Sequence, residues 1–224
     1  VGVGFETTTP LVAMAIKRAQ ALGLKNFSVF VAHKNMPNAL EVIVSDPELK
    51  IDALILPGHV STIIGTKPYE FLAEKYGIPG VITGFEPVDV LQGIAMIMRQ
   101  LHEGRAEIEI AYSRGVMREG NPVALAAIDE VFDTVDATWR GLSVIPGSGY
   151  AIREEFEAFD AVKRFHPEVE PTQNPKGCRC GDVLRGIMAP DECPLFRKVC
   201  TPENPVGPCM VSSEGSCAAY YRYY

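Results

Sequence analysis

The cysteines of this 224-residue chain are confined to one end of it. A secreted disulfide scaffold spreads its cysteines through a small domain. A cysteine cluster behind a long cysteine-free segment instead favours a metal or redox site in a reducing compartment. The cluster segment is also rich in proline and glycine and too short to bury much core, so it needs metal, cross-links or a docking surface. All six cysteines lie in the last 47 residues: Cys178, Cys180, Cys193, Cys200, Cys209 and Cys217.

Before the cysteines, short apolar runs alternate with amphipathic segments. This alternation predicts parallel βαβ units, and the nearly continuous apolar runs are typical of a sheet covered on both faces. We predict an α/β domain over residues 1–143, followed by a linker and a small cysteine-rich domain over residues 144–224. Strands are expected at 1–5, 27–32, 53–56, 81–83 and 107–112, with helices at 9–22, 37–45, 68–76, 87–103 and 121–132.

Charge and hydropathy exclude two classes of partner. The formal net charge of −7 and the sequence pI of about 5.2 argue against a nucleic-acid partner held through its phosphates. No apolar run reaches the roughly 20 residues that a membrane helix needs, so we expect no membrane anchor in this sequence. The chain begins with Val1 inside an apolar strand pattern. We therefore expect the N-terminal part of the natural protein to be missing from this sequence.

Three loops after predicted strands carry polar side chains. In a parallel sheet the loops that follow the strands meet at one edge, where ligands bind. Two carboxylates, an imidazole and hydroxyls gathered there can relay protons or hold a small polar ligand. The ordinary alternative is that threonine and glutamate near helix starts serve as caps and dipole partners. The candidate catalytic residues are Glu6, Thr7, Thr8, His59 and Glu86.

The spacing of the cysteines indicates the kind of metal site. Zinc sites usually contain two close C-x-x-C pairs, and this chain has none. Cys180, Cys193, Cys200 and Cys217 are separated by 12, 6 and 16 residues. Wide, irregular spacing with proline turns suits a cubane cluster held by four thiolates. Spacing alone does not choose four cysteines from six, so a zinc site and an all-disulfide arrangement with 15 connectivities stay open.

Long motifs along the whole chain resemble the hydrogenase maturation factors of the HypD family. They occur here in the same order as in that family: Gly4-Phe5-Glu6-Thr7-Thr8, Pro57-Gly58-His59-Val60-Ser61, Gly84-Phe85-Glu86-Pro87, Trp139-Arg140-Gly141-Leu142, Cys193-Pro194-Leu195-Phe196, and the stretch from Met210 to Tyr220.

The resemblance implies a cytoplasmic, redox-active assembly scaffold rather than a conventional turnover enzyme. Family members build the iron centre of nickel–iron hydrogenase, with its cyanide and carbonyl ligands. They work with a HypC-type chaperone and receive cyanide from a HypE-type carrier. The resemblance also implies a 4Fe–4S cluster and a redox disulfide. Carried onto this sequence, the cluster ligands match Cys180, Cys193, Cys200 and Cys217, and the disulfide pairs Cys178 with Cys209.

The chain departs from the family at its N-terminal side. The family's Cys-Gly-x-His-x-His and Cys-Pro-x-Cys motifs are absent here, as expected for a truncated sequence. The first of these motifs is thought to supply a thiolate to the iron being assembled. Two other functions remain open: a stand-alone iron–sulfur oxidoreductase acting on a small substrate, and a zinc-stabilised interaction module.

Overall fold

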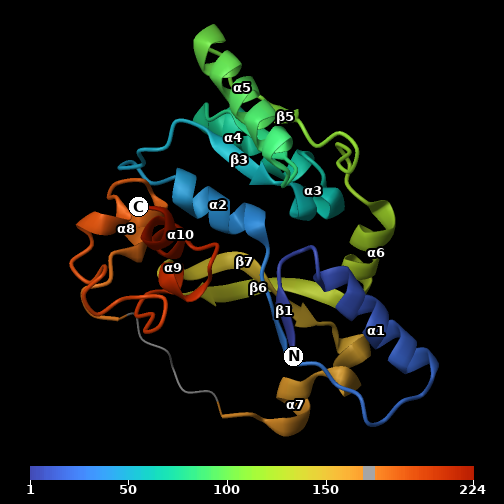
Figure 1. Ribbon diagram of the computed structural model, residues 1–224. Coiled ribbons are helices and arrows are strands. Elements are labelled where there is room, and N and C mark those ends of the chain that lie inside the picture. The colour runs from blue at the N-terminus through green and yellow to red at the C-terminus, as the bar shows by residue number, and fades with distance from the viewer. Residues whose placement is uncertain (169–174) are drawn as a thin grey trace. The chain divides into compact units, whose positions relative to one another are not determined.

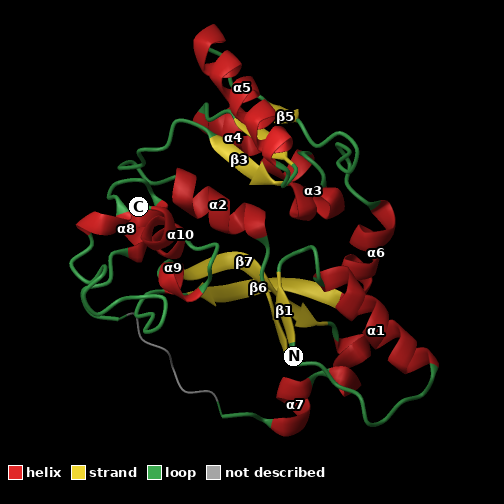
Figure 2. Ribbon diagram, viewed as in Figure 1, coloured by secondary structure: helices red, strands yellow, loops and turns green. Residues whose placement is uncertain are grey.

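The computed structural model describes residues 1–168 and 175–224. Most of the linker predicted at residues 167–175 lies outside the described residues. The α/β part alternates strands and helices, and the cysteine-rich end consists of short helices joined by turns (Figure 2). Contacts between residues divide the chain into two compact units. The first unit comprises Val1–Glu41, Asp52–Ala137 and Pro146–Pro167, and the second comprises Val42–Ile51, Thr138–Ile145 and Glu168–Tyr224.

The first unit contains a two-stranded parallel sheet in which β1 (Gly2–Gly4) pairs with β2 (Val31–His33). Helix α1 (Thr9–Ala21) follows β1 and packs against α6 (Pro122–Val131). Small and branched side chains of the two helices, such as Ala13 and Ile128, form a buried core with aromatic residues from the end of the unit. Those residues belong to η2 (Glu154–Phe159), which precedes α7 (Ala161–Phe165).

A second parallel sheet lies in the same unit, with the strand order β3-β4-β5 (Figure 1). Leu56, Val81 and Ile82 are buried in its centre. Each strand leads into a helix or loop at its carboxyl end, which places those loops along one edge. The elements are β3 (Leu54–Pro57), α3 (Gly58–Ile64), η1 (Lys67–Tyr69), α4 (Glu70–Tyr76), β4 (Gly80–Thr83), α5 (Pro87–Glu103) and β5 (Ile108–Ile110).

Helix α5 packs on this sheet through small and polar residues. A Cβ atom at Gly93 would overlap the side chain of Thr83, so the helix lies very close to β4. The buried Gln100 amide donates to Glu109 and accepts from the backbone N–H of Glu107, both at 2.8 Å. The apolar stripe recognised in the sequence therefore faces outward: Val88, Leu91, Ala95, Met98 and Leu101 are all exposed.

A β-hairpin that the sequence pattern did not predict follows α6. Strands β6 (Phe132–Trp139) and β7 (Ser143–Ile152) pair with each other, and a three-residue connection allows only an antiparallel arrangement. The base of the hairpin belongs to the first unit and its tip, Thr138–Ile145, to the second. Asn35, between β2 and α2 (Met36–Val44), holds β7 by donating from its backbone N–H to Ser148 and from its amide to Gly147.

The second unit has little regular structure. Its helices are α8 (Cys180–Leu184), η3 (Pro190–Glu192), α9 (Pro208–Val211) and α10 (Ser216–Tyr223). Helix α10 packs against α9 and η3. The buried core of this unit consists of cysteines together with Phe196, Met210 and Ala218. Sulfur atoms therefore take the place that aliphatic side chains fill in the first unit.

The predicted mixed α/β class with parallel strands is confirmed. The strands form two separate parallel sheets rather than one, because β2 ends the first sheet and β3 begins the second. The expected division at residue 143 stays a prediction. Within the described ranges, no helix combines the length and the apolar character that a membrane crossing requires.

Candidate functional site

All six cysteines line one small cavity in the second unit, with a volume of about 20 Å³. They come from α8 and the turn before it, from the turns that follow η3, and from α9 and α10. The remaining wall is largely apolar and includes Val183, Leu195, Phe196 and Met210. Such a shell limits the access of water to the sulfur atoms. Folding thus brings cysteines that are up to 39 positions apart in the sequence into one sulfur-rich pocket.

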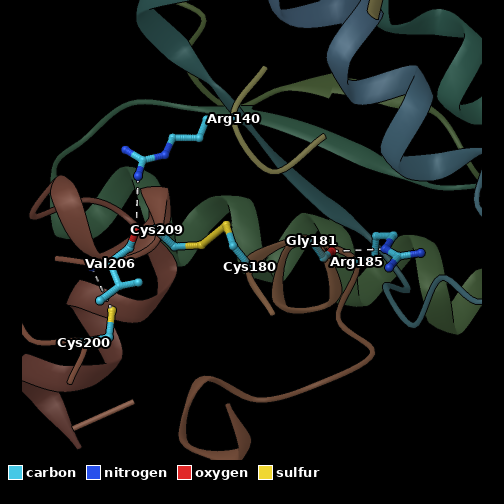
Figure 3. The surroundings of a disulfide bond; sticks show 7 residues. All are labelled: Arg140, Cys180, Gly181, Arg185, Cys200, Val206 and Cys209. Carbon is cyan, nitrogen blue, oxygen red and sulfur yellow. Dashed lines mark hydrogen bonds between the residues drawn. A yellow bond between two sulfur atoms is a disulfide. The ribbon is translucent and has the colours of Figure 1, made fainter. Parts of the chain in front are cut away.

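A disulfide joins Cys180, at the start of α8, to Cys209 in α9 (Figure 3). The pairing of Cys178 with Cys209 that the resemblance implied is therefore not the one in this structure. Cys178 lies two residues before Cys180, outside the helix, and its sulfur lies against Gly207. Cys180 begins α8 and faces Cys209, whereas Cys178 lies before the helix and does not. Their spacing along the chain does not distinguish the two cysteines.

Four thiols remain free in this cavity: Cys178, Cys193, Cys200 and Cys217. Burial, together with the charges of the other three thiols, raises the pKa of Cys217 to about 11. Negative charges gathered in an apolar cavity repel one another unless cations lie between them. Metal cations remove that cost by binding the deprotonated sulfurs. The donor set thus fits a thiolate-bound metal group.

Three of the four free thiols are among the cluster ligands predicted from the sequence. In the described residues, no three His, Cys, Asp or Glu side chains converge as the ligands of one metal ion do. A cubane cluster binds each cysteine through a different iron atom, so its ligands surround a larger body. The predicted ligands Cys193, Cys200 and Cys217 are among the free thiols, whereas the sulfur of Cys180 is engaged with Cys209.

Ionic contacts hold α8 in place beside the disulfide. The Arg185 guanidinium binds the carboxylates of Asp46 and Asp182. It also donates to the carbonyl of Gly181 at 3.1 Å (Figure 3). Arg179 binds the other oxygen of Asp182. Hydrogen bonds from the Glu48 backbone and from Arg185 lower the pKa of Asp46. The segment 42–51 is thereby fastened to the helix that begins with Cys180.

The wall around Cys200 is also fixed by hydrogen bonds. The backbone N–H of Val206 donates to the sulfur of Cys200 at 3.4 Å, and the carbonyl of Val206 accepts from Arg140 at 3.2 Å (Figure 3). This hydrogen bond fixes the position of the Cys200 sulfur relative to the loop that contains Val206. Arg140, in the tip of the hairpin, thus fastens the loop that carries this donor.

In the first unit, His59 and Glu86 lie at the carboxyl edge of the β3-β4-β5 sheet. Gly58 begins α3 directly after β3, and a Cβ atom there would overlap the carbonyl of Thr83 on β4. This close approach carries His59 past the strand end, where it stacks on Phe85 with ring centroids 4.1 Å apart. Both side chains are exposed. The structure therefore brings together two of the three predicted loops.

Asp89 and Arg114 complete this edge and were not recognised from the sequence. Arg114 donates to both oxygens of the buried Asp89 carboxylate, at 2.8 and 2.6 Å, and lies over the ring of Tyr112. The hydrogen bonds from Arg114 lower the pKa of Asp89. Glu86 lies 4.0 Å from the same guanidinium. The sequence signal that could have revealed Asp89 was an acidic residue in the first turn of the predicted helix, three residues after Glu86.

Glu6 is not exposed at an edge but is 99% buried, with 1% relative exposure. Its Oε1 accepts from the backbone N–H of Met36 at 2.8 Å, so it caps the start of α2 from another element. Its Oε2 has no hydrogen-bond donor among the described residues. Burial raises the pKa of this carboxyl, and its charge contributes to the raised pKa of the buried Tyr69. Glu6 is thus a structural carboxyl held inside the unit.

Thr7 and Thr8 lie in the turn before α1 and are exposed. The hydroxyl of Thr8 donates to the carbonyls of Phe5 and Val3, at 3.2 and 3.4 Å. In the described part of the chain, no hydrogen bond joins either threonine to His59 or Glu86. Their predicted catalytic role stays a prediction, and their local contacts are those of turn residues.

A surface hollow of about 470 Å³ lies between α2 and the edge of the β3-β4-β5 sheet. Met36 and Leu40 of α2 form one wall, and residues of β3 and the β4–α5 loop, including Phe85, form the other. Because Glu6 binds the backbone of Met36, it positions α2 beside this hollow. Glu6 therefore holds one wall of the hollow in place without lining the hollow itself.

Comparison with known sequences places the chain among proteins of hydrogenase formation. The profile of the family called HypD, described as "Hydrogenase formation hypA family", matches residues 1–224. The chain belongs to the HypD family. This membership confirms the resemblance seen in the sequence motifs.

Several named relatives are similar over nearly all of this chain. The hydrogenase maturation factor HypD of Cupriavidus necator is 48% identical over 228 residues, which cover 99% of this chain and 60% of that protein. The hydrogenase expression/formation protein HupD of Azotobacter chroococcum is 49% identical over 227 residues, with the same coverage. HypD of Rhodobacter capsulatus is 48% identical over 227 residues, again with 99% and 60% covered. The chain thus spans about 60% of the length of these HypD relatives.

Proposed function

We propose that this chain is the part of a hydrogenase maturation factor that holds a 4Fe–4S cluster and serves the assembly of the hydrogenase iron centre. The observation that carries the proposal is the cavity lined by six cysteines, four of them free thiols. Membership in the HypD family supports the role in hydrogenase maturation. The proposed place of action is the cytoplasm, where thiols are kept reduced.

The proposed cluster ligands are Cys178, Cys193, Cys200 and Cys217. This set replaces Cys180 by Cys178, because Cys180 is bonded to Cys209 and has no thiolate to offer in that state. A bound 4Fe–4S cluster supplies one-electron redox chemistry. The protein's own part is to hold the four sulfurs, to exclude water with Phe196 and its neighbours, and to keep a reducible disulfide in the same cavity.

The exposed edge of the β3-β4-β5 sheet is the proposed place where this chain meets the iron being assembled, which is a substrate with its cyanide and carbonyl ligands. His59 offers an imidazole and Glu86 a carboxylate for proton transfer there. The ion pair of Asp89 with Arg114 keeps the loop rigid. A HypC-type chaperone and a HypE-type cyanide carrier are the proposed macromolecular partners.

Iron and sulfide analysis of the chain purified without oxygen tests the cluster. We expect about four iron and four sulfide per chain, with a brown absorption band that bleaches on reduction. Cys178→Ser should abolish most of the bound iron, whereas Cys180→Ser and Cys209→Ser should retain it. Retention by Cys178→Ser together with loss by Cys180→Ser would restore the ligand set first expected from the sequence. A colourless protein with one zinc would contradict the cluster altogether.

Hydrogenase maturation by a full-length member of the family tests the edge. His59→Ala introduced there should lower hydrogenase activity by roughly 10²-fold or more if the imidazole transfers a proton. His102→Ala, an exposed histidine at the end of α5, is the matched control and should leave activity unchanged. Equal activity of both variants would remove His59 from the site, and an intact complex with the HypC-type chaperone would show that binding was not the cause.

A further inference from the structure

Helix α5 presents apolar side chains to solvent along its whole length. Val88 and Leu91 are 72% and 66% exposed near its start, and Met98 and Leu101 are 59% and 41% exposed near its end. The opposite side of the helix packs closely on β4 at Gly93 (Figure 1). The apolar face is therefore not the face that folding of this unit uses, and its removal from water is favourable.

The exposed apolar residues of α5 repeat with the period of a coiled coil. They follow one another at intervals of three, four and three residues, which is the spacing of the a and d positions of a heptad. These positions are Val88, Leu91, Ala95 and Met98. Ile94, which is also exposed, lies beside them. A stripe with this period fits another helix, because each side chain can insert between residues of the partner helix.

The exposed stripe of α1 lacks this continuity. Leu11 and Met14 are exposed and begin a similar repeat, but Arg18 occupies its next position. A charge at that position interrupts the apolar surface after about one helical turn. Helix α5 therefore differs from α1 in offering a continuous face for a second helix.

The charges at the two ends of the α5 face select the partner and its direction. Glu86 lies just before α5 with its side chain 78% exposed, and Arg99 is exposed near the other end. Two copies of α5 that run in the same direction would place like charges against each other. Two copies that run in opposite directions place Glu86 of each beside Arg99 of the other and also oppose the helix dipoles favourably. The face is thus complementary to a second copy of itself.

The sizes of the side chains agree with the same alignment. With Glu86 beside Arg99 of the second copy, Val88 lies opposite Met98, and Leu91 lies opposite Ala95. The small alanine leaves room for the larger leucine, as facing positions in a packed interface require. Because a twofold dimer repeats each contact, the two helices form four apolar layers.

We propose that two copies of this chain associate through antiparallel pairing of their α5 helices. The inference goes beyond the proposed function and depends on no bound cluster. A single helix face buries less than the roughly 800 Å² that each partner contributes to a standard interface, so the dimer is weak and reversible, with a Kd in the micromolar range. Each copy also brings its Arg99 to Glu86 of the other, which adds a cation to the edge that contains His59.

Sedimentation velocity of this chain, from about 1 µM to about 300 µM, tests the association. We expect the monomer to give way to a dimer across this range, without an intermolecular disulfide on a non-reducing gel. Leu91→Glu and Met98→Glu should each raise the Kd about tenfold or more, because a charge enters an apolar layer. Leu11→Glu makes the matched change on α1 and should leave the Kd within about twofold. Circular dichroism of the monomers verifies that all three variants are folded.

Charge reversal tests the antiparallel direction without changing the apolar positions. Glu86→Lys and Arg99→Glu should each raise the Kd about threefold to tenfold, since each change affects two symmetric pairs. The double variant should return to the wild-type Kd, because both pairs are then restored with their signs exchanged.

Three results would overturn the proposal. A chain that stays monomeric at about 300 µM would leave the face of α5 to a different protein or to another part of a longer chain. A dimer that tolerates both Leu91→Glu and Met98→Glu would have its contact elsewhere. A double charge variant that associates more weakly than either single variant would contradict the antiparallel pairing.

Discussion

The tripeptide Gly-Phe-Glu occurs twice in the first unit, at residues 4–6 and 84–86, each time between a parallel strand and a helix. The two glutamates have opposite surroundings. Glu6 is 1% exposed and binds the backbone of Met36, whereas the side chain of Glu86 is 78% exposed. The same three residues therefore serve as an internal fastening in one loop and as a surface group in the other.

The distance from the tripeptide to the next helix explains the difference. After Glu6 the chain makes a turn through Thr7 and Thr8 before α1 begins, and this turn directs Glu6 inward to α2. Glu86 is itself the residue before α5, with extended backbone angles, and so points away from the sheet. In this second loop the buried acid is Asp89 instead, which binds Arg114. A motif thus specifies the strand-to-helix transition but not the burial of its acid.

The largest effect expected from this comparison is on stability. Glu6→Ala leaves the buried N–H of Met36 without its acceptor and opens a cavity, at a cost of about 2–3 kcal/mol. Glu86→Ala should change stability by less than about 0.5 kcal/mol, as exposed substitutions do. Urea unfolding of both variants at pH 4.5, the ordinary pKa of glutamate, measures the two. Similar losses in both variants would show that the two loops are equivalent.

A smaller loss is expected from Asp89→Ala. This change removes both hydrogen bonds to Arg114, but the guanidinium is half exposed and keeps its hydration. We expect a loss of stability between those of Glu6→Ala and Glu86→Ala. Thermal unfolding of the three variants gives the order, and Arg114→Lys, which keeps the charge without the paired geometry, should resemble Asp89→Ala. An Asp89→Ala melting temperature equal to that of Glu86→Ala would mean that the ion pair has no structural role.

The next effect appears only as a dependence on pH. Burial raises the pKa of Glu6 in the folded chain above its ordinary value of 4.5, so the folded state holds this proton more tightly than the unfolded state. Stability from this group is present below pH 4.5 and is lost as the pH rises through the folded pKa. Glu6→Gln keeps the acceptor for Met36 and removes the ionisation.

Unfolding free energies of the wild type and Glu6→Gln from pH 4 to pH 8 test this sign. The wild type should lose stability relative to the variant as the pH rises. Glu86→Gln is the control and should follow the wild type across the range, because its site is exposed. A wild type that gained stability over Glu6→Gln with rising pH would show that the buried carboxyl is stabilised as an anion.

Much of the fold followed from local patterns, because each short apolar run between helical segments became a strand or lay beside one. The hairpin β6–β7 did not follow, since its outward residues are mostly exposed and Pro146-Gly147-Ser148-Gly149 has the composition of a turn. Asn35, more than 100 residues away, holds that segment as a strand. Likewise, the apolar stripe of α5 could not reveal that Gly93 and Gln100 make the buried face. Contacts between distant residues decided these features.

The candidate site, like the fold, was predictable from the sequence only where local patterns decide it. Parallel-strand logic correctly brought His59 and Glu86 to one edge, and clustering along the chain brought the six cysteines together. The burial of Glu6 depends on α2, which is 30 residues away, and no local pattern reports it. The choice between Cys178 and Cys180 depends on which residue begins α8, because the two differ by only two positions. The spacing of cysteines along the sequence cannot distinguish between two cysteines that are only two positions apart.

The smallest expected effect concerns the aromatic residue of the exposed tripeptide. Phe85 stacks on His59 at the edge of the second sheet, and both rings are largely in solvent. A double-mutant cycle with His59→Ala and Phe85→Ala should give a coupling free energy of about 0.5 kcal/mol, at the low end for paired rings because little area is buried. The same cycle with His102→Ala in place of His59→Ala should give none, since no ring contact joins those positions in the described residues. If the His59 cycle also gave zero, the stack would not organise the edge, and the order of the edge would rest on the ion pair of Asp89 with Arg114.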